Sequence, residues 1–162
     1  MMKNKKRSAP IILSAMLLSS TLTATAAPLP EGHWSSSEKG WQYQTETGVL
    51  QNVWSQSETG DWYYFDTDGI MSAGWKQIKA ADGKLHWYYF APDGVMATGW
   101  RQVTDANGKP QWYYFVPDGA MATGWQQIKD TDGQDKWYYL NTDGSMQTGW
   151  VSQGDTTYYL NP

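Results

Sequence analysis

The sequence of 162 residues contains no cysteine and only two histidines. The absence of cysteine excludes disulfide bonds, thiol catalysis and lipid attachment through a cysteine. His33 and His86 have no nucleophile or set of metal ligands nearby in the sequence, so we expect both on the surface. No other combination of residues is typical of a catalytic site. We therefore expect a protein that is not an enzyme and that has no cofactor and no metal.

Long hydrophobic runs are also missing, except for one stretch near the N-terminus. Basic residues crowd the first positions, residues 11–22 are apolar, and residues 24–26 are small. This order predicts a signal peptide over residues 1–26, and the apolar stretch is shorter than the roughly 20 residues that a spanning helix needs. Residues 27–33 follow as a short flexible lead-in, too short for a catalytic domain. We expect a secreted protein with no membrane span after cleavage.

Basic residues are scarce in the rest of the chain. Removing residues 1–26 removes four of 12 Lys and Arg residues and none of 16 Asp and Glu residues, which leaves 8 minus 16, a formal charge of −8. Such a surface repels nucleic acid and attracts cationic groups. Nucleic acid is therefore not an expected partner.

Tryptophan and tyrosine, by contrast, are abundant, with 11 of each, and they recur at a fixed period. A Trp-Tyr-Tyr block that is followed by Asp-Gly and then by Gly-Trp begins at Trp62, Trp87, Trp112 and Trp137, in steps of 25 residues. Weaker copies extend this pattern to both ends, which gives about six units over residues 34–162. Terminal repeats of a stacked array are usually atypical, because one of their faces meets water.

Each unit predicts a β-hairpin, because two short aromatic or β-branched runs flank a turn signal. The two tryptophans of a hairpin are 8 residues apart from Trp54 to Trp62 and 12 residues apart from Trp75 to Trp87. Four added residues place two in each arm, so both tryptophans keep one face. The spacing of seven in the outermost units requires a different turn or a bulge. A lone hairpin is marginally stable, so we expect an all-β solenoid of stacked hairpins.

Stacking in chain order brings the tryptophan pair of one hairpin to the first tyrosine of the next block. Three electron-rich rings suit a quaternary ammonium group, and at about 0.5–2 kcal/mol per ring they predict roughly millimolar binding. Several such sites facing one polymer gain avidity. The alternative is that the rings only pack one hairpin on another. The repeated tryptophan pairs argue for partly open rings, while the methionines and Tyr89, Tyr114 and Tyr139 pack.

The units from Gly74-Trp75 through residues 87–90 to residues 93–100 resemble the cell-wall-binding repeats of choline-binding proteins from Gram-positive bacteria and their phages. The resemblance covers about residues 34–162. It implies a left-handed β-solenoid that binds the choline or phosphocholine of teichoic or lipoteichoic acid and so stays on the cell surface. The units of 25 residues are longer than the usual repeat of that family, which is about 20 residues.

By motif position, a site of that family combines the Trp after Gly, the Trp opening the next block, and the first Tyr of the following block. The corresponding sets here are Trp54, Trp62 and Tyr88; Trp75, Trp87 and Tyr113; Trp100, Trp112 and Tyr138; and Trp125, Trp137 and Tyr158. Trp34, Trp41 and Tyr63 would form a fifth set, but it lies in the degenerate first unit and is not counted among the four predicted sites. Trp150 lacks a partner, because Thr157 stands in the tryptophan position.

Two alternatives remain open. Related aromatic and glycine repeats occur in glucan-handling exoproteins, so a carbohydrate-binding repeat protein is the first. The paired tryptophans favour choline over glucan, because a flat polysaccharide requires a platform rather than a cage. The second alternative is a structural adhesin stalk without a small ligand. A homodimer formed through the last hairpin is a further hypothesis.

Overall fold

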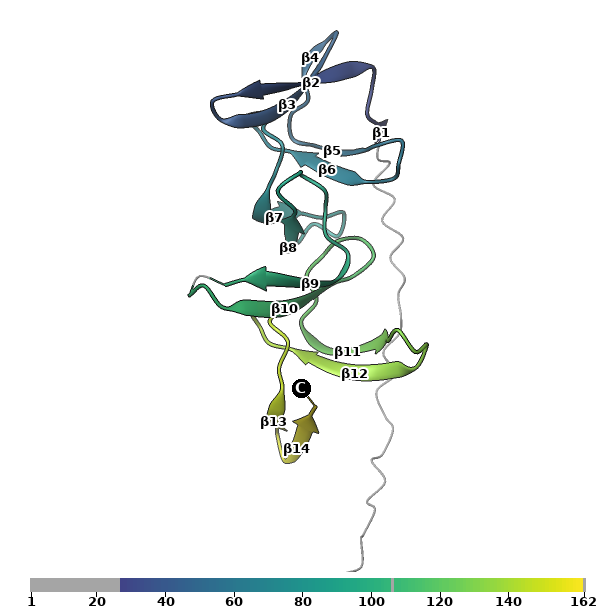
Figure 1. The fold of residues 1–162 in the computed structure, drawn as a ribbon, viewed down its shortest axis with the longest axis vertical. Coiled ribbons are helices and arrows are strands. Elements are labelled where there is room, and N and C mark those ends of the chain that lie inside the picture. The colour runs from purple at the N-terminus through teal and green to yellow at the C-terminus, as the bar shows by residue number, and fades with distance from the viewer. Residues whose placement is uncertain (1–26, 106, 162) are drawn as a thin grey trace, which may run out of the picture.

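The computed structural model describes residues 27–105 and 107–161 (Figure 1). The predicted signal peptide, residues 1–26, lies outside the described residues. The described part of the chain contains fourteen strands and no helix. Accordingly, no helix in these residues is long and apolar enough to cross a membrane.

Six antiparallel hairpins follow one another along the long axis of the molecule and point in different directions around it (Figure 1). They pair β2 (Gly32–Ser37) with β3 (Gly40–Thr45), β5 (Val53–Gln56) with β6 (Trp62–Phe65), β7 (Gly74–Lys79) with β8 (Leu85–Phe90), β9 (Gly99–Thr104) with β10 (Pro110–Phe115), β11 (Gly124–Lys129) with β12 (Asp135–Leu140), and β13 (Gly149–Gln153) with β14 (Thr156–Leu160). The short strand β4 (Gly48–Val49) extends the first hairpin. The predicted all-β array of stacked hairpins is confirmed.

The N-terminal segment differs from the flexible lead-in expected for residues 27–33. The short strand β1 (Ala27–Pro28) pairs in parallel with β5, and the N–H of Leu29 donates to the carbonyl of Gln56 at 3.0 Å. The strand β2 already begins at Gly32. The segment is held because it covers the outer edge of β5, whose backbone groups would otherwise be unpaired.

The hairpin registers keep each tryptophan pair on one face despite the different spacings. Trp54 lies opposite Tyr64 in the shorter hairpin, and Trp75 lies opposite Tyr89 in the longer one. A connection of five residues joins the strands in both, so the four extra residues lengthen each arm by two. This is the arrangement that the spacing predicts.

The two outermost hairpins accommodate the spacing of seven residues through a shorter turn. Only two residues separate the paired ends of β2 and β3, and the same holds for β13 and β14. Compared with the hairpin of β5 and β6, the turn is three residues shorter and each arm is one residue longer, so the spacing falls by one. Trp34 still lies opposite Tyr43, and Trp150 opposite Tyr159, which confirms the expectation of a different turn.

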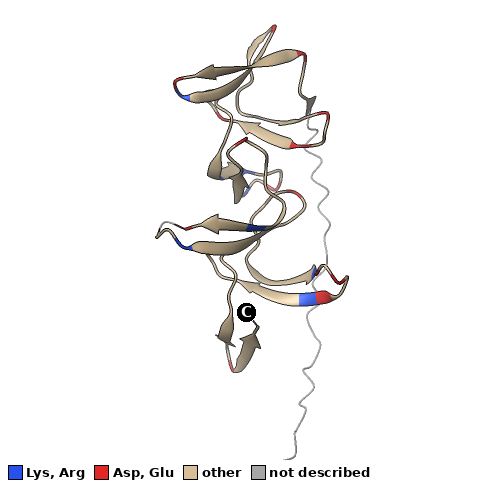
Figure 2. Cartoon of the chain, in the orientation of Figure 1, with Lys and Arg blue, Asp and Glu red and all other residues tan. Residues whose placement is uncertain are grey.

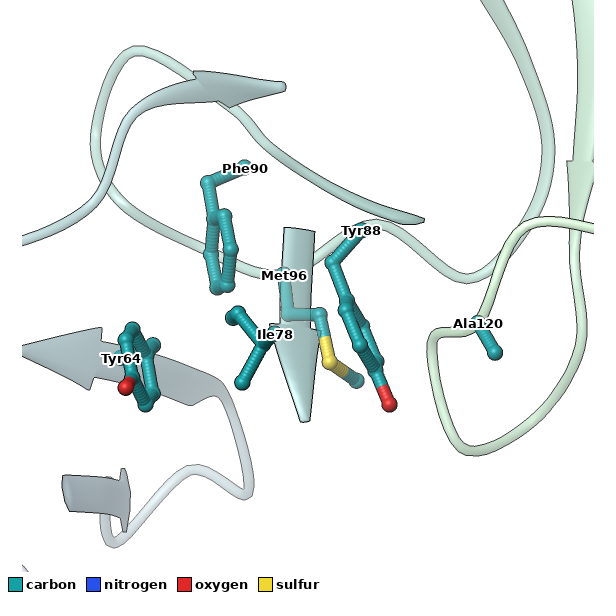
Figure 3. Close-up of a cluster of buried hydrophobic side chains, with 6 residues drawn as sticks. All are labelled: Tyr64, Ile78, Tyr88, Phe90, Met96 and Ala120. Atoms are coloured by element: carbon teal, nitrogen blue, oxygen red, sulfur yellow. The ribbon is translucent and has the colours of Figure 1, made fainter. Parts of the chain in front are cut away.

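The core is a column of side chains between successive hairpins. Its fully buried members end the second strand of the four middle hairpins; they are Phe65, Phe90, Phe115 and Leu140. Figure 3 shows one cluster, which draws on two hairpins and two linkers and contains Tyr64, Ile78, Tyr88, Phe90, Met96 and Ala120. Each layer of the core is thus shared between neighbours, as expected for a stack without a central core.

Backbone hydrogen bonds from the linkers fasten each hairpin to an earlier one. Met71, in the linker after the second hairpin, donates its N–H to the carbonyl of Trp41 in the first hairpin at 2.7 Å. The same bond recurs three times, from Met96 to Trp62, Met121 to Trp87 and Met146 to Trp112, at 2.7–2.8 Å. The glycine of the following linker then packs on the first three of these methionines. Gly94 packs in this way on Met71.

The close approach of linker glycines to methionines predicts a position-specific loss of stability. A Cβ at Gly119 would lie 2.2 Å from the Sδ of Met96, whereas a Cβ at Gly83 meets nothing within 4 Å. Both residues have positive φ angles, of 85° and 78°. We expect Gly83→Ala to lose roughly 1–2 kcal/mol from backbone strain, and Gly119→Ala roughly 1–3 kcal/mol more from overpacking, in denaturant unfolding. Equal losses would contradict this account.

The burial of Tyr88 predicts a loss of stability at alkaline pH. Burial, followed by the carboxylates of Asp118 and Asp82, raises the pKa of Tyr88 to about 12. An unfolded tyrosine ionises near pH 10, so the contribution of Tyr88 is complete below pH 10 and is lost as the pH rises toward about 12.

We expect Tyr88→Phe to lower the pH dependence of the unfolding free energy between pH 9 and about 11. The control is Tyr159→Phe, because Tyr159 is exposed. This variant should follow the parent protein across the same pH range. A Tyr88→Phe variant with the parent's full pH dependence would show that another group titrates.

Candidate functional site

Each predicted set of three rings is brought together at a junction between hairpins. We number the ring sets in chain order: set 1 is Trp34, Trp41 and Tyr63; set 2 is Trp54, Trp62 and Tyr88; set 3 is Trp75, Trp87 and Tyr113; set 4 is Trp100, Trp112 and Tyr138; and set 5 is Trp125, Trp137 and Tyr158. Sets 2 to 5 are the four predicted ones. In each set the two tryptophans come from one hairpin and the tyrosine from the next.

The rings of a set form the walls of an open box. In set 3 the ring centroids of Trp75 and Trp87 are 6.4 Å apart with an interplanar angle of 85°. Those of Trp75 and Tyr113 are 4.8 Å apart at 69°. The equivalent Trp–Trp and Trp–Tyr distances are 6.3 and 5.1 Å in set 2, 6.4 and 4.8 Å in set 4, and 6.4 and 4.9 Å in set 5. Such steep angles direct several ring faces and edges toward one small volume.

The two tryptophans of a set have different surroundings. Trp75 also contacts Tyr89 at 5.2 Å and Phe115 at 5.6 Å, so it belongs both to the core and to the box. Trp87 is 43% exposed, and its ring contact within the described residues is with Trp75. Trp75 therefore anchors the junction, whereas Trp87 is an outer wall open to solvent.

The tyrosine of a set forms the back wall. Tyr88 and Tyr113 are only 2% and 7% exposed, whereas Tyr158 at the end of the array is 40% exposed. We expected Tyr89 to pack, and it does contact Trp75, yet it is less buried than Tyr88. The reason is that the linker after the next hairpin covers Tyr88, because Ala120 of that linker belongs to the same buried cluster (Figure 3). Burial raises the pKa of both back-wall tyrosines, so their phenols stay neutral.

Set 1, the fifth set that the sequence indicated in the degenerate first unit, lines an open cavity of about 420 Å³. Trp34 and Tyr63 have ring centroids 5.5 Å apart. The remaining lining residues are Trp41, Met71, Pro92 and Asp93. The hairpin register places Trp41 on the same face as Trp34, despite the spacing of seven residues. The array therefore presents five ring sets.

Trp150 at the end of the array completes no set. It is 72% exposed and contacts Tyr159, which is 56% exposed, at 5.0 Å. Thr157 occupies the position of a second tryptophan, as the sequence indicated.

The described residues offer no site for a metal. No group of three or more side chains among them has the composition and closeness to hold a metal ion. The Nε2 atom of His86 lies 2.9 Å from a carboxylate oxygen of Asp82 at an exposed hairpin turn. Figure 2 shows that the charged residues lie largely at turns and linkers, and that acidic residues recur along the whole array. The ring sets therefore lie on an acidic molecule.

Comparisons with known families identify the repeat. The family described as a choline-binding repeat matches residues 73–122 and 123–162, and the family described as a putative cell wall binding repeat matches residues 56–71. A search of curated protein sequences finds no match.

Solved structures show the same relationship. Choline-binding protein F from Streptococcus pneumoniae is similar with a TM-score of 0.65 and 36% identity, over 82% of this chain and 43% of that protein. The cell wall endolysin of phage Cp-1 in complex with choline has a TM-score of 0.50 and 33% identity, over 80% of this chain and 35% of the endolysin. An alternansucrase from Leuconostoc mesenteroides has a TM-score of 0.56 and 29% identity, over 72% of this chain and 10% of the enzyme.

The extent of these matches indicates a module. The chain spans less than half the length of choline-binding protein F and a small part of the two enzymes. The similarity to those enzymes therefore lies in a separate repeat module. Because the repeat model covers more than half of the sequence, in register with the hairpins, the chain belongs to the choline-binding repeat family of binding modules.

Proposed function

We propose that this protein is secreted and attaches non-covalently to the bacterial cell surface by binding choline residues of teichoic or lipoteichoic acid. The observation that carries the proposal is the box of three aromatic rings, which recurs at successive hairpin junctions with nearly constant geometry. Choline-binding protein F and the endolysin solved with choline support the choice of ligand. The predicted signal peptide supports secretion.

The chemistry of the box matches a quaternary ammonium group. Such a group cannot donate a strong hydrogen bond, and its charge is spread over methyl groups that can contact several ring faces together. The outer tryptophans of sets 3, 4 and 5 are 43%, 43% and 58% exposed, so a ligand can reach them from solvent. The excess of acidic residues also draws a cation toward the array.

Repetition compensates for the weakness of one site. Three rings supply roughly 3–5 kcal/mol, which corresponds to binding on the order of millimolar. A polymer that carries many choline groups can occupy several junctions together, with a gain of about 10²–10⁴ in avidity. We infer that attachment depends on the array and not on any single box.

A carbohydrate-binding function is the second candidate, because a similar alternansucrase has been solved with isomaltotriose. Sugar rings stack best on a flat aromatic platform. Here the two tryptophans of a set meet at 80–85°, which forms a corner and not a platform. The ring geometry therefore favours choline.

The proposal predicts a countable loss of choline binding when the outer walls are removed. We expect equilibrium dialysis to show saturation at five choline molecules per chain and millimolar choline. The triple variant Trp87→Ala, Trp112→Ala, Trp137→Ala should saturate at two, because sets 1 and 2 remain. Its fold should persist, since these three side chains are exposed.

The matched control is Trp150→Ala, which removes a more exposed tryptophan that belongs to no set. This variant should still bind five choline molecules. A titration with dextran, followed by tryptophan fluorescence, tests the second candidate. A response to dextran without one to choline would assign the array to glucan, and no response to either would leave a structural stalk.

A further inference from the structure

Three of the five ring sets lie beside a carboxylate that comes from farther along the chain. The clearest case is set 1, where Asp93 lines the same cavity as Trp34, Trp41 and Tyr63. Asp93 belongs to the linker after the third hairpin, whereas these rings belong to the first and second hairpins. The carboxylate therefore reaches a box to which its own hairpin contributes no ring.

Two linkers placed one on the other bring Asp93 to this position. Met71 donates its N–H to the carbonyl of Trp41, and Gly94 packs directly against the side chain of Met71. Asp93 precedes Gly94 and is thereby held over the outer wall of the box. The position of Asp93 is thus fixed by the Met71–Trp41 backbone hydrogen bond and by the packing of Gly94 on Met71.

The same stacking of linkers recurs at sets 2 and 3. Met96 bonds to the carbonyl of Trp62, and Gly119, next to Asp118, packs on Met96. The equivalent residues at set 3 are Met121, bonded to Trp87, and Gly144, which follows Asp143 and packs on Met121. The pKa values of the tyrosines agree with this placement. After burial, the pKa of Tyr63 is raised by the carboxylates of Asp61 and Asp93, that of Tyr88 by Asp118 and Asp82, and that of Tyr113 by Asp143 and Asp105.

These carboxylates have no cationic partner among the described residues. In each of them Oδ1 accepts a hydrogen bond from the backbone N–H two residues later, at 3.0–3.1 Å, which fixes the turn. Asp143 also accepts from the hydroxyl of Ser145 at 2.6 Å. The negative charge itself is not neutralised by a salt bridge.

Sets 4 and 5 lack this feature in the described chain. Met146 bonds to the carbonyl of Trp112 as its counterparts do, but within the described residues no further Asp-Gly linker packs on Met146. The aromatic rings of set 4 are otherwise arranged like those of set 3. Asp130 lines a cavity with Trp137 and Tyr138, but it is paired with Lys136. The array therefore combines similar boxes with and without an adjacent, unpaired linker carboxylate.

We propose that the linker carboxylates Asp93, Asp118 and Asp143 divide the five sites into two classes, with sets 1 to 3 selecting the positive charge of the ligand. This inference rests on the proposed function, since it concerns the same sites. A carboxylate beside the box attracts a trimethylammonium group but offers nothing to a neutral tert-butyl group of the same shape. The attraction weakens as salt screens it.

The test compares choline with its neutral isostere 3,3-dimethylbutan-1-ol in the parent chain and in Asp118→Asn. Asparagine keeps the oxygen that accepts the turn hydrogen bond and removes the charge. Binding is followed through the indole N–H signals of ¹⁵N-labelled protein, because Trp54 and Trp62 report on set 2 alone. We expect Asp118→Asn to weaken choline binding at set 2 roughly two- to fivefold, the range of an exposed ion pair, and to leave the neutral ligand unchanged.

The matched control is Asp68→Asn, at the same position of the first Asp-Gly linker. The Nε2 of Gln42 donates to the carbonyl of Asp68 at 3.4 Å, and Asp68 is not among the residues that line the cavity of set 1. The control should bind both ligands like the parent chain.

Three results have different meanings. An unchanged choline affinity at set 2 in Asp118→Asn, with choline still bound at all sets, overturns this inference alone. Equal weakening of choline and the neutral isostere also overturns it, because the change would then be one of shape. If choline shifts no indole signal in the parent chain, the proposed function fails as well.

Discussion

The array depends on the hydrogen bond from each linker methionine N–H to the carbonyl of an outer tryptophan, which lies one hairpin before the hairpin that the linker follows. A two-stranded hairpin is marginally stable in water, so each unit must be held by another. This bond fixes the linker against an earlier hairpin and so sets the direction of the next one. It also holds the backbone of the residue that forms the outer wall of the box. The same contact therefore builds the stack and positions the candidate site.

Stability and binding share the inner tryptophans. Trp54 contacts Trp62 and Tyr88 of its box and also the buried Phe90, so its ring belongs to the site and to the core. A ligand that contacts such a ring favours the packed junction over the separated hairpins, and it stabilises the folded array by mass action. The exposed outer tryptophans Trp87, Trp112 and Trp137 lack this coupling, because they extend from the edge of the junction into solvent. Removal of an exposed outer tryptophan should therefore affect binding with little effect on stability, whereas removal of an inner tryptophan should affect both.

The sequence was sufficient to predict which side chains share a face of a hairpin, but less so to predict the contacts between hairpins. Side-chain alternation with a period of two placed Trp75 and Trp87 on one face, and the fixed repeat identified Tyr113 as their neighbour. Neither rule describes the path of a linker. For that reason the pairing of β1 with β5, the deeper burial of Tyr88 relative to Tyr89, and the place of Asp93 in the cavity of set 1 were not predicted. Each depends on where a connecting segment crosses an earlier unit.

The linkers contact ring sets of earlier hairpins, so the surroundings of the ring sets differ even though the units are similar. A ring set needs two consecutive hairpins, so six hairpins give five sets. A set with a carboxylate also needs the linker that follows a third hairpin and leads to a fourth, so six hairpins give three. An array of n such hairpins thus has n − 1 ring sets, of which n − 3 have the carboxylate. The fraction of ring sets with an adjacent carboxylate rises with the number of hairpins. Added repeats therefore change the proportion of the two classes of site as well as the number of sites.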